Sequence, residues 1–259
     1  MERIDGLHLE TLLAAAVFTG ARVAGLMVFC PFYGNVAIPA PLKAALTLLL
    51  TILLYPLHGP LRLDLQPWQW AGVALSEVLI GLLLGLAANF MLEGPLLAGQ
   101  ILGVQMGYSL ATLFDPQTQA DTPVLSEFHS LGALLIFLQL DVHHWLLRAV
   151  VRSFAYLPAG QATASLAAAS GVWHAAAGIF LAGVQIAAPS LAATLVADIA
   201  LGFLGKASPQ LPVLFIGLAV KNLLGLAVLI GVLAYWPHSF SQRFAEGIAM
   251  GERLLRLAH

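Results

Sequence analysis

The sequence predicts an all-α membrane protein built from helical hairpins, and three observations support this fold class. Of the 259 residues, 60% are apolar and 9% are charged, whereas a soluble domain carries about 25% charged residues. Long apolar runs recur along the chain, and several reach the roughly 20 residues that a bilayer-spanning helix needs. No run alternates polar and apolar residues over a useful length, as the strands of an outer-membrane barrel would.

The apolar runs locate the expected helices. Residues 71–91 form one complete predicted helix, whereas the runs at 42–57 and 96–110 are short for a bilayer. The run at 172–204 is too long for one straight span, and Pro189 is expected to kink or break it because proline cannot donate to the helix ladder. Short connections that carry Pro and Gly indicate helical hairpins. The full set of runs is 12–29, 42–57, 70–92, 96–110, 130–151, 172–204 and 211–235.

The C-terminal segment from His238 has a different pattern. Phe240, Phe244 and Ile248 recur every four residues, and polar residues lie between them. This pattern predicts an amphipathic helix that lies on a membrane surface or on a partner. The segment also holds three arginines, which favour a cytoplasmic location for this end: Arg243, Arg253 and Arg256.

Charge and cysteine content exclude several functions. The net charge of -2 argues against nucleic-acid binding, which needs clustered Lys and Arg. Cys30 is the single cysteine, so no disulfide can form within the chain. No short apolar core with an A-x-A cleavage site follows the N-terminus, so the first apolar run is expected to be retained.

Ionisable side chains lie within or at the edges of the apolar runs. A charge at the bilayer centre costs about 2.5–3.5 kcal/mol, so six of them would cost roughly 15–20 kcal/mol if all faced lipid. We therefore expect them to pair inside a helix bundle, to line water, or to lie outside ordinary bilayer. Arg22, Glu77, Asp198 and Lys221 are the predicted buried polar residues, and Lys221 is expected to have a carboxylate or carbonyl partner. The six are Arg22, Glu77, Glu93, Asp141, Asp198 and Lys221.

Small residues are spaced for close helix packing. Gly99, Gly103 and Gly107 form a doubled GxxxG pattern, and Gly81 and Gly85 form a single one. This spacing puts a smooth strip on one helix face and lets two backbones approach. The strip can pack within the chain or against another protein, and two flanking amides suit protein better than lipid: Gln100 and Gln105.

Asp141, His143 and His144 form the best candidate for a metal or proton site. Asp141 and His144 share a helix face at a spacing of three residues, as in a proton relay. A polar helix end that meets water or a neighbouring subunit explains them as well. No Cys or second His pair completes a zinc set, so no metal is expected. The sequence also lacks the hydrolase nucleophile, P-loop and dinucleotide motifs, so we predict neither a cofactor nor an enzyme.

A polar loop interrupts the apolar pattern after residue 105. The helix pattern gives way to Gly107 and then to Asp115-Pro116, which favours a turn, and the loop ends near Pro123. Irregular backbone cannot face lipid because its N–H and C=O groups would stay unpaired there. The loop must therefore lie in water, in a pore, or inside protein.

Several separated motifs occur in order along the chain. They are Arg22, Pro31, Gly34, Ile38-Pro39, Glu77, Gly81, Gly85, Met106-Gly107, Ala111-Thr112, Asp115-Pro116, Pro123-Val124-Leu125, His143, Ser153-Phe154, Leu157-Pro158-Ala159-Gly160, Ala188-Pro189, Asp198, Leu201-Gly202, Pro209-Gln210-Leu211 and Lys221. In these motifs the chain, most closely over residues 106–160, resembles the FliR family, a membrane component of the flagellar type III protein export gate whose counterpart in injectisomes is SctT. The similarity extends over about residues 10–240, although the family commonly has Asn at Pro212 and Gly at Asp141. The Asn-to-Pro difference puts the start of the local helix in doubt.

The resemblance implies an architecture. A FliP-like unit, about residues 1–180, would be joined to a hairpin at 181–237 that resembles the two-helix subunit FliQ, with an amphipathic tail at 238–259. The chain would assemble with FliP-like and FliQ-like subunits in the bacterial inner membrane, at the flagellar basal body. Its other implied partners are an FlhB-like switch protein, unfolded secreted substrates and membrane lipid.

The resemblance also implies that the loop at 106–122 plugs the closed channel. The implied plug residues are Met106, Gly107, Tyr108, Leu113, Phe114, Asp115 and Pro116. From the residues alone, an ordinary interhelical loop is the simpler interpretation. A different class of function, a proton- or ion-coupled small-solute transporter, would use Glu77, Asp141, His144, Asp198 or Lys221, but no inverted repeat stands out.

Overall fold

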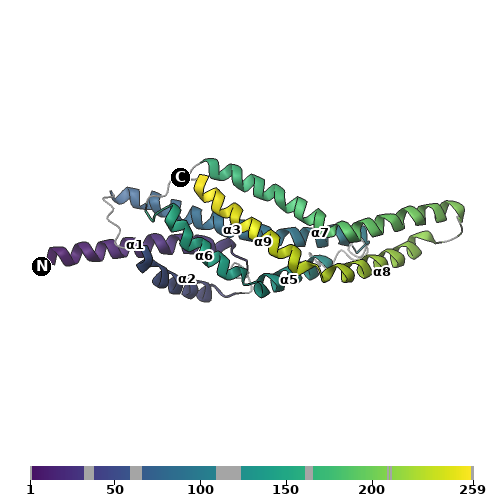
Figure 1. Ribbon diagram of the computed structural model, residues 1–259, viewed down its shortest axis with the longest axis horizontal. Helices are drawn as coiled ribbons and strands as arrows, with labels where there is room; N and C mark the ends of the chain where they lie inside the picture. The colour runs from purple at the N-terminus through teal and green to yellow at the C-terminus, as the bar shows by residue number, and fades with distance from the viewer. Residues whose placement is uncertain are drawn as a thin grey trace. The chain divides into compact units, whose positions relative to one another are not determined.

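The computed structural model describes residues 2–31, 38–58, 66–108, 124–160, 166–208, 210 and 212–257. Every regular element in these ranges is a helix (Figure 1), so the all-α prediction is confirmed for this part of the chain. The elements are α1 (Glu2–Phe29), α2 (Ala40–Leu54) with a short 3-10 turn (Tyr55–His58), α3 (Pro67–Gln105), α5 (Val124–Gln139), α6 (Val142–Tyr156), α7 (Leu166–Ala207), α8 (Val213–Leu233) and α9 (Trp236–Leu257).

Two prolines lie inside long helices. The apolar runs at 70–92 and 96–110 form the single helix α3, which continues through Pro95. Of the kink or break expected at Pro189, the break is wrong, because α7 is one helix of 42 residues that includes Pro189, and the kink stays a prediction. An internal proline removes one hydrogen bond from the ladder, and the turns on both sides can keep the helix continuous when neighbouring helices hold it.

Other boundaries follow from local backbone chemistry. The run at 130–151 divides into α5 and α6 at Asp141, whose φ of 54° is left-handed and stops the first helix. Asp tolerates this conformation better than most residues. At the start of α8, Pro212 is the N-cap with φ -76°, and its carbonyl accepts from Phe215 N at 3.1 Å and Ile216 N at 3.2 Å. Proline is compatible with a helix start, where an N–H would have no partner.

The chain divides into two compact units, each assembled from separated segments. Unit 1 comprises Met1–Phe90, Asp141–Ala176 and Phe244–His259. Unit 2 comprises Met91–Leu140 and Ala177–Arg243. Helices α3, α7 and α9 contribute residues to both units. These units do not test the predicted division near residue 180, which stays a prediction.

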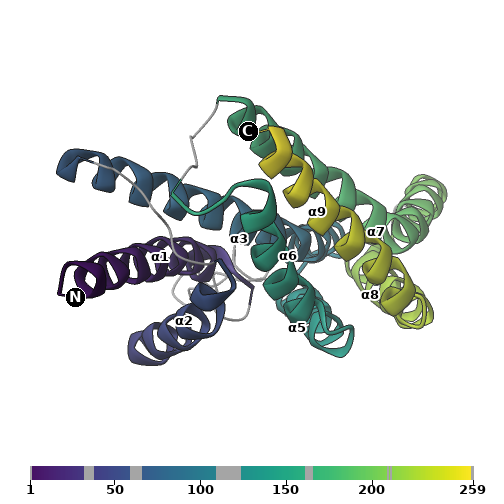
Figure 2. The ribbon, with the colours of Figure 1, turned by 60° about the vertical axis from the view of Figure 1, so that its left-hand side comes forward.

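In unit 1, α1 lies between α2 and the first part of α3 (Figure 2). The Phe18 and Trp70 rings stack with centroids 5.1 Å apart. Gly81 faces the backbone of α1 so closely that an added Cβ would overlap the carbonyl oxygen of Arg22. A Cβ on Gly85 would lie 2.6 Å from the carbonyl oxygen of Leu26. The GxxxG pair of α3 therefore packs within the chain, against α1.

In unit 2, glycines again mark close contacts between helices. A Cβ on Gly99 would overlap the backbone of α5 at Ser126, so α3 and α5 touch there through their main chains. A Cβ on Gly183 of α7 would lie 2.9 Å from the Leu97 side chain of α3. The core residues Leu102 and Phe137 are buried in this unit. The second half of α3 is thus enclosed by α5 and α7.

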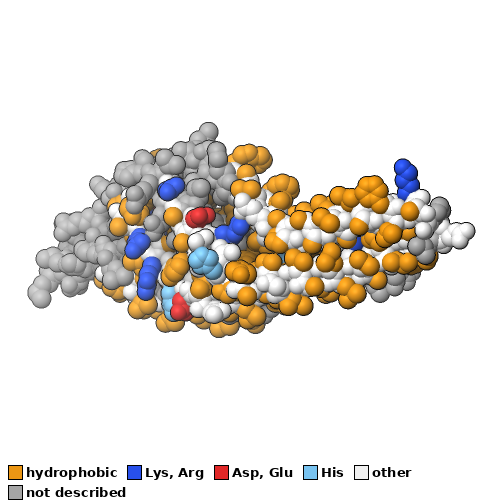
Figure 3. All heavy atoms as spheres, turned by 45° about the vertical axis from the view of Figure 1, so that its right-hand side comes forward, with side chains coloured by type: hydrophobic (Ala, Val, Ile, Leu, Met, Phe, Trp, Pro, Cys, Tyr) orange, Lys and Arg blue, Asp and Glu red, His pale blue; other side chains and the backbone are white. Residues whose placement is uncertain are grey.

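The outer surface of α7 and α8 is strongly apolar. Their large exposed hydrophobic residues include Val196, Ile199, Phe203, Phe215, Leu223 and Ile230. Figure 3 shows hydrophobic side chains covering this part of the molecule over most of the visible face. Among the described residues, four helices are long and apolar enough to cross a membrane, or five segments if α5 and α6 count as one broken span.

Replacing Gly81 with Ala should destabilise unit 1, because the new methyl group would push against the main chain of α1. Overpacking of this kind costs about 1–3 kcal/mol. Gly72→Ala is the matched control on the same helix, since nothing lies within 4 Å of its Cβ position and Ala favours a helix over Gly by about 0.8–1.0 kcal/mol. The measurement is thermal unfolding of both variants in detergent. Equal midpoints for the two would contradict the close α1–α3 contact.

Candidate functional site

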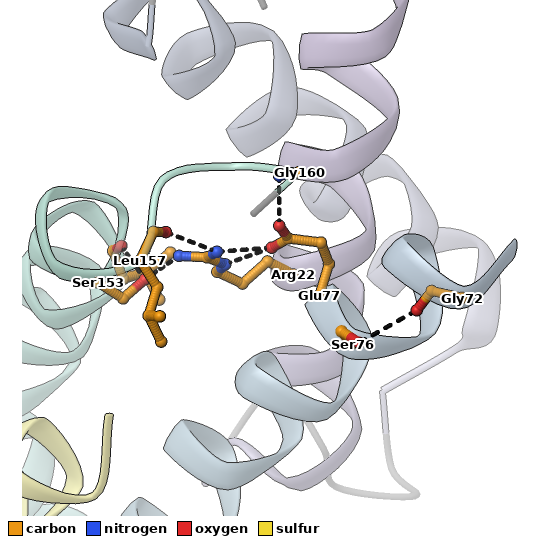
Figure 4. Close-up of polar contacts among 8 residues, drawn as sticks. Arg22, Gly72, Ser76, Glu77, Ser153, Leu157 and Gly160 are labelled. Carbon is orange, nitrogen blue, oxygen red and sulfur yellow. Dashed lines mark hydrogen bonds and ion pairs between the residues drawn. The ribbon is translucent and has the colours of Figure 1, made fainter. Parts of the chain in front are cut away.

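A buried ion pair joins α1 to α3 in unit 1. The side chains of Arg22 and Glu77 are both 0% exposed. Arg22 Nε donates to Glu77 Oε2 at 2.7 Å, and Arg22 Nη2 lies 2.6 Å from the same oxygen. Figure 4 shows the two side chains pointing toward each other from their helices. A charge buried this deeply needs both a counter-charge and hydrogen bonds to its remaining polar atoms.

The remaining atoms of the pair are also satisfied. Arg22 Nη1 donates to Ser153 Oγ at 2.9 Å, and Nη2 donates to the carbonyl oxygen of Leu157 at 2.9 Å. Glu77 Oε1 accepts from the Gly160 backbone N–H at 2.8 Å. The guanidinium carbon lies 3.9 Å from the centroid of the Phe154 ring. This Arg22–Glu77 network therefore ties α1 and α3 to α6 and to the turn that follows it (Figure 4).

The turn after α6 is shaped to complete this network. Gly160 has φ 81°, a left-handed conformation that glycine adopts without strain. Ser153 donates its own hydroxyl to the carbonyl oxygen of Val150 at 2.6 Å, which leaves its oxygen lone pairs for Arg22. Sequence reasoning predicted that Arg22 and Glu77 need partners but did not identify them. The signal was present, since Ser153 and the 157–160 turn are among the residues that resemble the family.

A second polar cluster lies in unit 2 and connects three helices. Lys221 Nζ of α8 lies 2.9 Å from Asp198 Oδ1 of α7. Gln105 Nε2, at the end of α3, donates to Asp198 Oδ2 at 2.8 Å. Lys221 thus has a carboxylate partner. The Asp198 side chain is 41% exposed and that of Lys221 19%, so this pair is only partly enclosed by the chain itself.

The end of α3 is fixed by main-chain hydrogen bonds. Tyr108 N donates to Gly103 O at 2.9 Å, and Gly107 N donates to Val104 O at 3.1 Å. With Gly107 at φ 83°, these bonds form a Schellman motif, which satisfies the last carbonyls of a helix. Met106 is 1% exposed, and a Cβ on Gly225 of α8 would lie 2.9 Å from its sulfur. The predicted plug segment therefore begins from an anchored helix end.

The remaining predicted residues are placed as follows. Gln100 is exposed and Gly103 is buried. Of the predicted plug residues, Met106, Gly107 and Tyr108 are described, whereas four lie outside the described residues: Leu113, Phe114, Asp115 and Pro116.

Asp141, His143 and His144 do come together at the start of α6. His144 Nδ1 lies 3.5 Å and His143 Nε2 lies 3.9 Å from Asp141 Oδ1. His129, which directly precedes the apolar run at 130–151, belongs to unit 2. It is buried there, with Nδ1 2.7 Å from the carbonyl oxygen of Leu125 and its ring centroid 5.1 Å from that of Trp236.

Long apolar helices, an apolar outer surface and fully neutralised buried charges define a multi-pass membrane protein. Its sequence matches the family described as "Bacterial export proteins, family 1" over residues 13–247. The flagellar biosynthetic protein FliR of Escherichia coli (strain K12) is 30% identical over 227 residues, which cover 86% of this chain and 87% of that protein.

Two further relatives agree with this match. FliR of Bacillus subtilis (strain 168) is 30% identical over 223 residues, covering 85% of this chain and 86% of that protein. FliR of Pectobacterium carotovorum subsp. carotovorum is 32% identical over 236 residues, covering 86% and 87%. The chain belongs to the FliR family of bacterial export proteins, and the resemblance inferred from its motifs is confirmed.

Arg22→Met and Glu77→Gln should each destabilise the protein strongly, because each leaves one buried charge without its counter-charge. Breaking a buried pair in this way costs about 3–5 kcal/mol. The double variant buries no charge at this site, so its loss should be smaller than the sum of the two single losses. The measurement is the free energy of unfolding in detergent for all three variants.

Ser76→Ala is the control for this cycle, because the Ser76 hydroxyl donates within its own helix, to the carbonyl oxygen of Gly72 at 3.1 Å, and takes no part in the Arg22–Glu77 network as the described residues form it. It should change stability little. The ion pair does not hold unit 1 together if the single variants are as stable as Ser76→Ala. The same conclusion follows if the loss of unfolding free energy in the double variant equals the sum of the two single losses.

Proposed function

We propose that this chain is a structural and gating subunit of the flagellar type III protein export gate. As a member of the FliR family of bacterial export proteins, it is a membrane component of flagellar protein export. The family match over residues 13–247 carries the proposal, since it includes the buried Arg22–Glu77 pair, the partly enclosed Asp198–Lys221 pair and the loop between α3 and α5. The chain acts without catalysis: it shapes a conduit for unfolded flagellar proteins.

In the proposed assembly the chain packs with FliP-like and FliQ-like subunits. The exposed apolar residues of α7 and α8 give such subunits a large hydrophobic surface to cover. The half-exposed carboxylate of Asp198 also supports a protein neighbour, since a charge that faced lipid would be costly. The FliP-like part at about 1–180 and the FliQ-like hairpin at 181–237 belong to this proposal, as does an FlhB-like switch protein.

In the proposed gate, the loop from residue 106 to about 122 closes the channel. The end of α3, which precedes the loop, supports this proposal. The Schellman motif and the buried Met106 side chain hold the N-terminal end of the loop in place. Leu113 and Phe114, which lie outside the described residues, would supply apolar contacts that block the lumen. Opening would then displace the loop beyond Tyr108 and leave α3 intact.

The Gln105–Asp198–Lys221 cluster fits a role as the anchor of this gate. Gln105 is the last residue of α3, and Asp198 and Lys221 belong to α7 and α8, which we propose form the FliQ-like hairpin. Asp198 accepts hydrogen bonds from both Gln105 and Lys221. A movement of the proposed hairpin would therefore also displace Gln105, which directly precedes the loop. The anchor thus couples subunit packing to the position of the plug.

The transporter alternative receives less support from the geometry. A coupling residue must exchange protons or ions with water during transport. Glu77 is enclosed at 0% exposure, and its two oxygens accept from Arg22 and Gly160. It therefore suits a structural role, and substrate uptake by liposomes that contain only this chain would be needed to revive the transporter hypothesis.

The proposed assembly predicts that the full-length chain co-purifies from membranes with FliP-like and FliQ-like subunits and is poorly stable without them. The reason is the large apolar surface on α7 and α8. Mild-detergent extraction followed by mass spectrometry of the purified complex is the test. A stable, monodisperse chain obtained free of such partners would count against the assembly.

Deleting residues 113–118 should make the assembled gate leak small solutes, since the deletion removes the apolar tip of the proposed plug. The measurement is solute permeability of membranes that carry the assembly. Replacing Gln117, Thr118 and Gln119 with Ser keeps the apolar tip and serves as the control, which should stay closed. Unchanged permeability in a deletion variant that still assembles would rule out the plug.

A further inference from the structure

We propose that Asp141, His143 and His144 form a binding site for a divalent transition-metal ion of the zinc type at the start of α6. One ligand atom from each residue lies within 4.8 Å of those of the other two. Among the described residues, this is the only group of three such side chains that meets this distance. The site lies wholly in unit 1 and is separate from the Arg22–Glu77 network.

The spacing is close to what a metal ion requires. Zn–N and Zn–O bonds of about 2.0–2.1 Å in a tetrahedral arrangement separate neighbouring ligand atoms by about 3.3 Å. Asp141 Oδ1 lies 3.5 Å from His144 Nδ1 and 3.9 Å from His143 Nε2. The side chains of Asp141 and His144 are 66% and 56% exposed, so small rotations can bring all three ligand atoms to one ion.

The ligand types select the class of ion. Two imidazoles with one carboxylate suit Zn²⁺, Ni²⁺ or Cu²⁺, whereas Mg²⁺ and Ca²⁺ prefer ligand sets made of oxygen. Three protein ligands leave a fourth position on zinc, which water or a side chain from a partner can fill. The structure thus assigns an open site and not a closed four-ligand zinc finger.

Two further features are compatible with a ligand at this place. Asp141 has a left-handed backbone at φ 54°, a conformation that Asp tolerates but that Gly adopts at lower cost, so glycine would fit this position without supplying a ligand. The trio also interrupts the apolar run at 130–151. A bound cation would neutralise the carboxylate there and lower the cost of an anion among apolar helices.

The test is a titration of the untagged full-length chain in detergent with Zn²⁺, measured by calorimetry or by competition with a chromophoric chelator. Asp141→Gly removes the carboxylate and keeps a residue suited to φ 54°, and His144→Ala removes one imidazole. Loss of a supporting residue alone weakens metal binding 10–100-fold, so each variant should raise the Zn²⁺ Kd at least about tenfold. A large excess of Mg²⁺ should not displace the zinc.

His238→Ala is the control, because His238 is an exposed helix-surface histidine whose ring lies 3.4 Å from the side-chain amide of Gln242, on the next turn of the same helix. It should leave the Kd unchanged. If Asp141→Gly and His144→Ala both bind zinc as the parent chain does, or if Mg²⁺ competes at similar concentrations, the site does not exist. Circular dichroism checks that each variant is helical. If His144→Ala folds poorly, the zinc affinity of Asp141→Gly by itself decides whether the site exists.

Discussion

The rest of unit 1 depends on one constraint: the guanidinium of Arg22 has no access to water. Burying an ion costs several kcal/mol even after the protein relaxes, and only a close counter-charge with full hydrogen bonding offsets that cost. The counter-charge comes from Glu77, and further acceptors come from Ser153 and the carbonyl of Leu157. Residues far apart in sequence must therefore reach one point together. That requirement fixes α1, α3 and α6 against each other more specifically than apolar packing could.

Much of the helical fold follows from the sequence, because apolar runs and glycine spacing reflect forces that act locally. The apolar runs locate the helices up to α8, although one run divides into α5 and α6, and the amphipathic pattern locates α9. The spacing of Gly81 and Gly85 predicts a close helix contact. Two errors lie at internal prolines. The gap between the apolar runs at 70–92 and 96–110, which holds Pro95, and the break considered at Pro189 are both crossed by continuous helices, because each proline costs one hydrogen bond while the other bonds and contacts of the helix persist. Pro212 raised doubt about α8 and instead lies where a helix start accepts it.

The polar sites are less predictable for a physical reason. A costly charge such as Arg22 is visible in the sequence, but a backbone carbonyl like that of Leu157 carries no side-chain signature of its role as an acceptor. The pairing of Asp198 with Lys221 could be anticipated from charge, whereas the third member, Gln105, could not, because amides serve many partners. At the end of α3 the sequence shows a glycine at position 107, but it does not predict the Schellman hydrogen bonds, which are seen in the structure.

Helix α9 has a consequence for how the protein folds. Phe240 and Phe244 of α9 are both buried one turn apart, and the first belongs to unit 2 while the second belongs to unit 1. Each core therefore includes a residue of the same helix, so neither is complete until α9 has formed. Loss of α9 by truncation before Trp236 would leave two incomplete cores, not one.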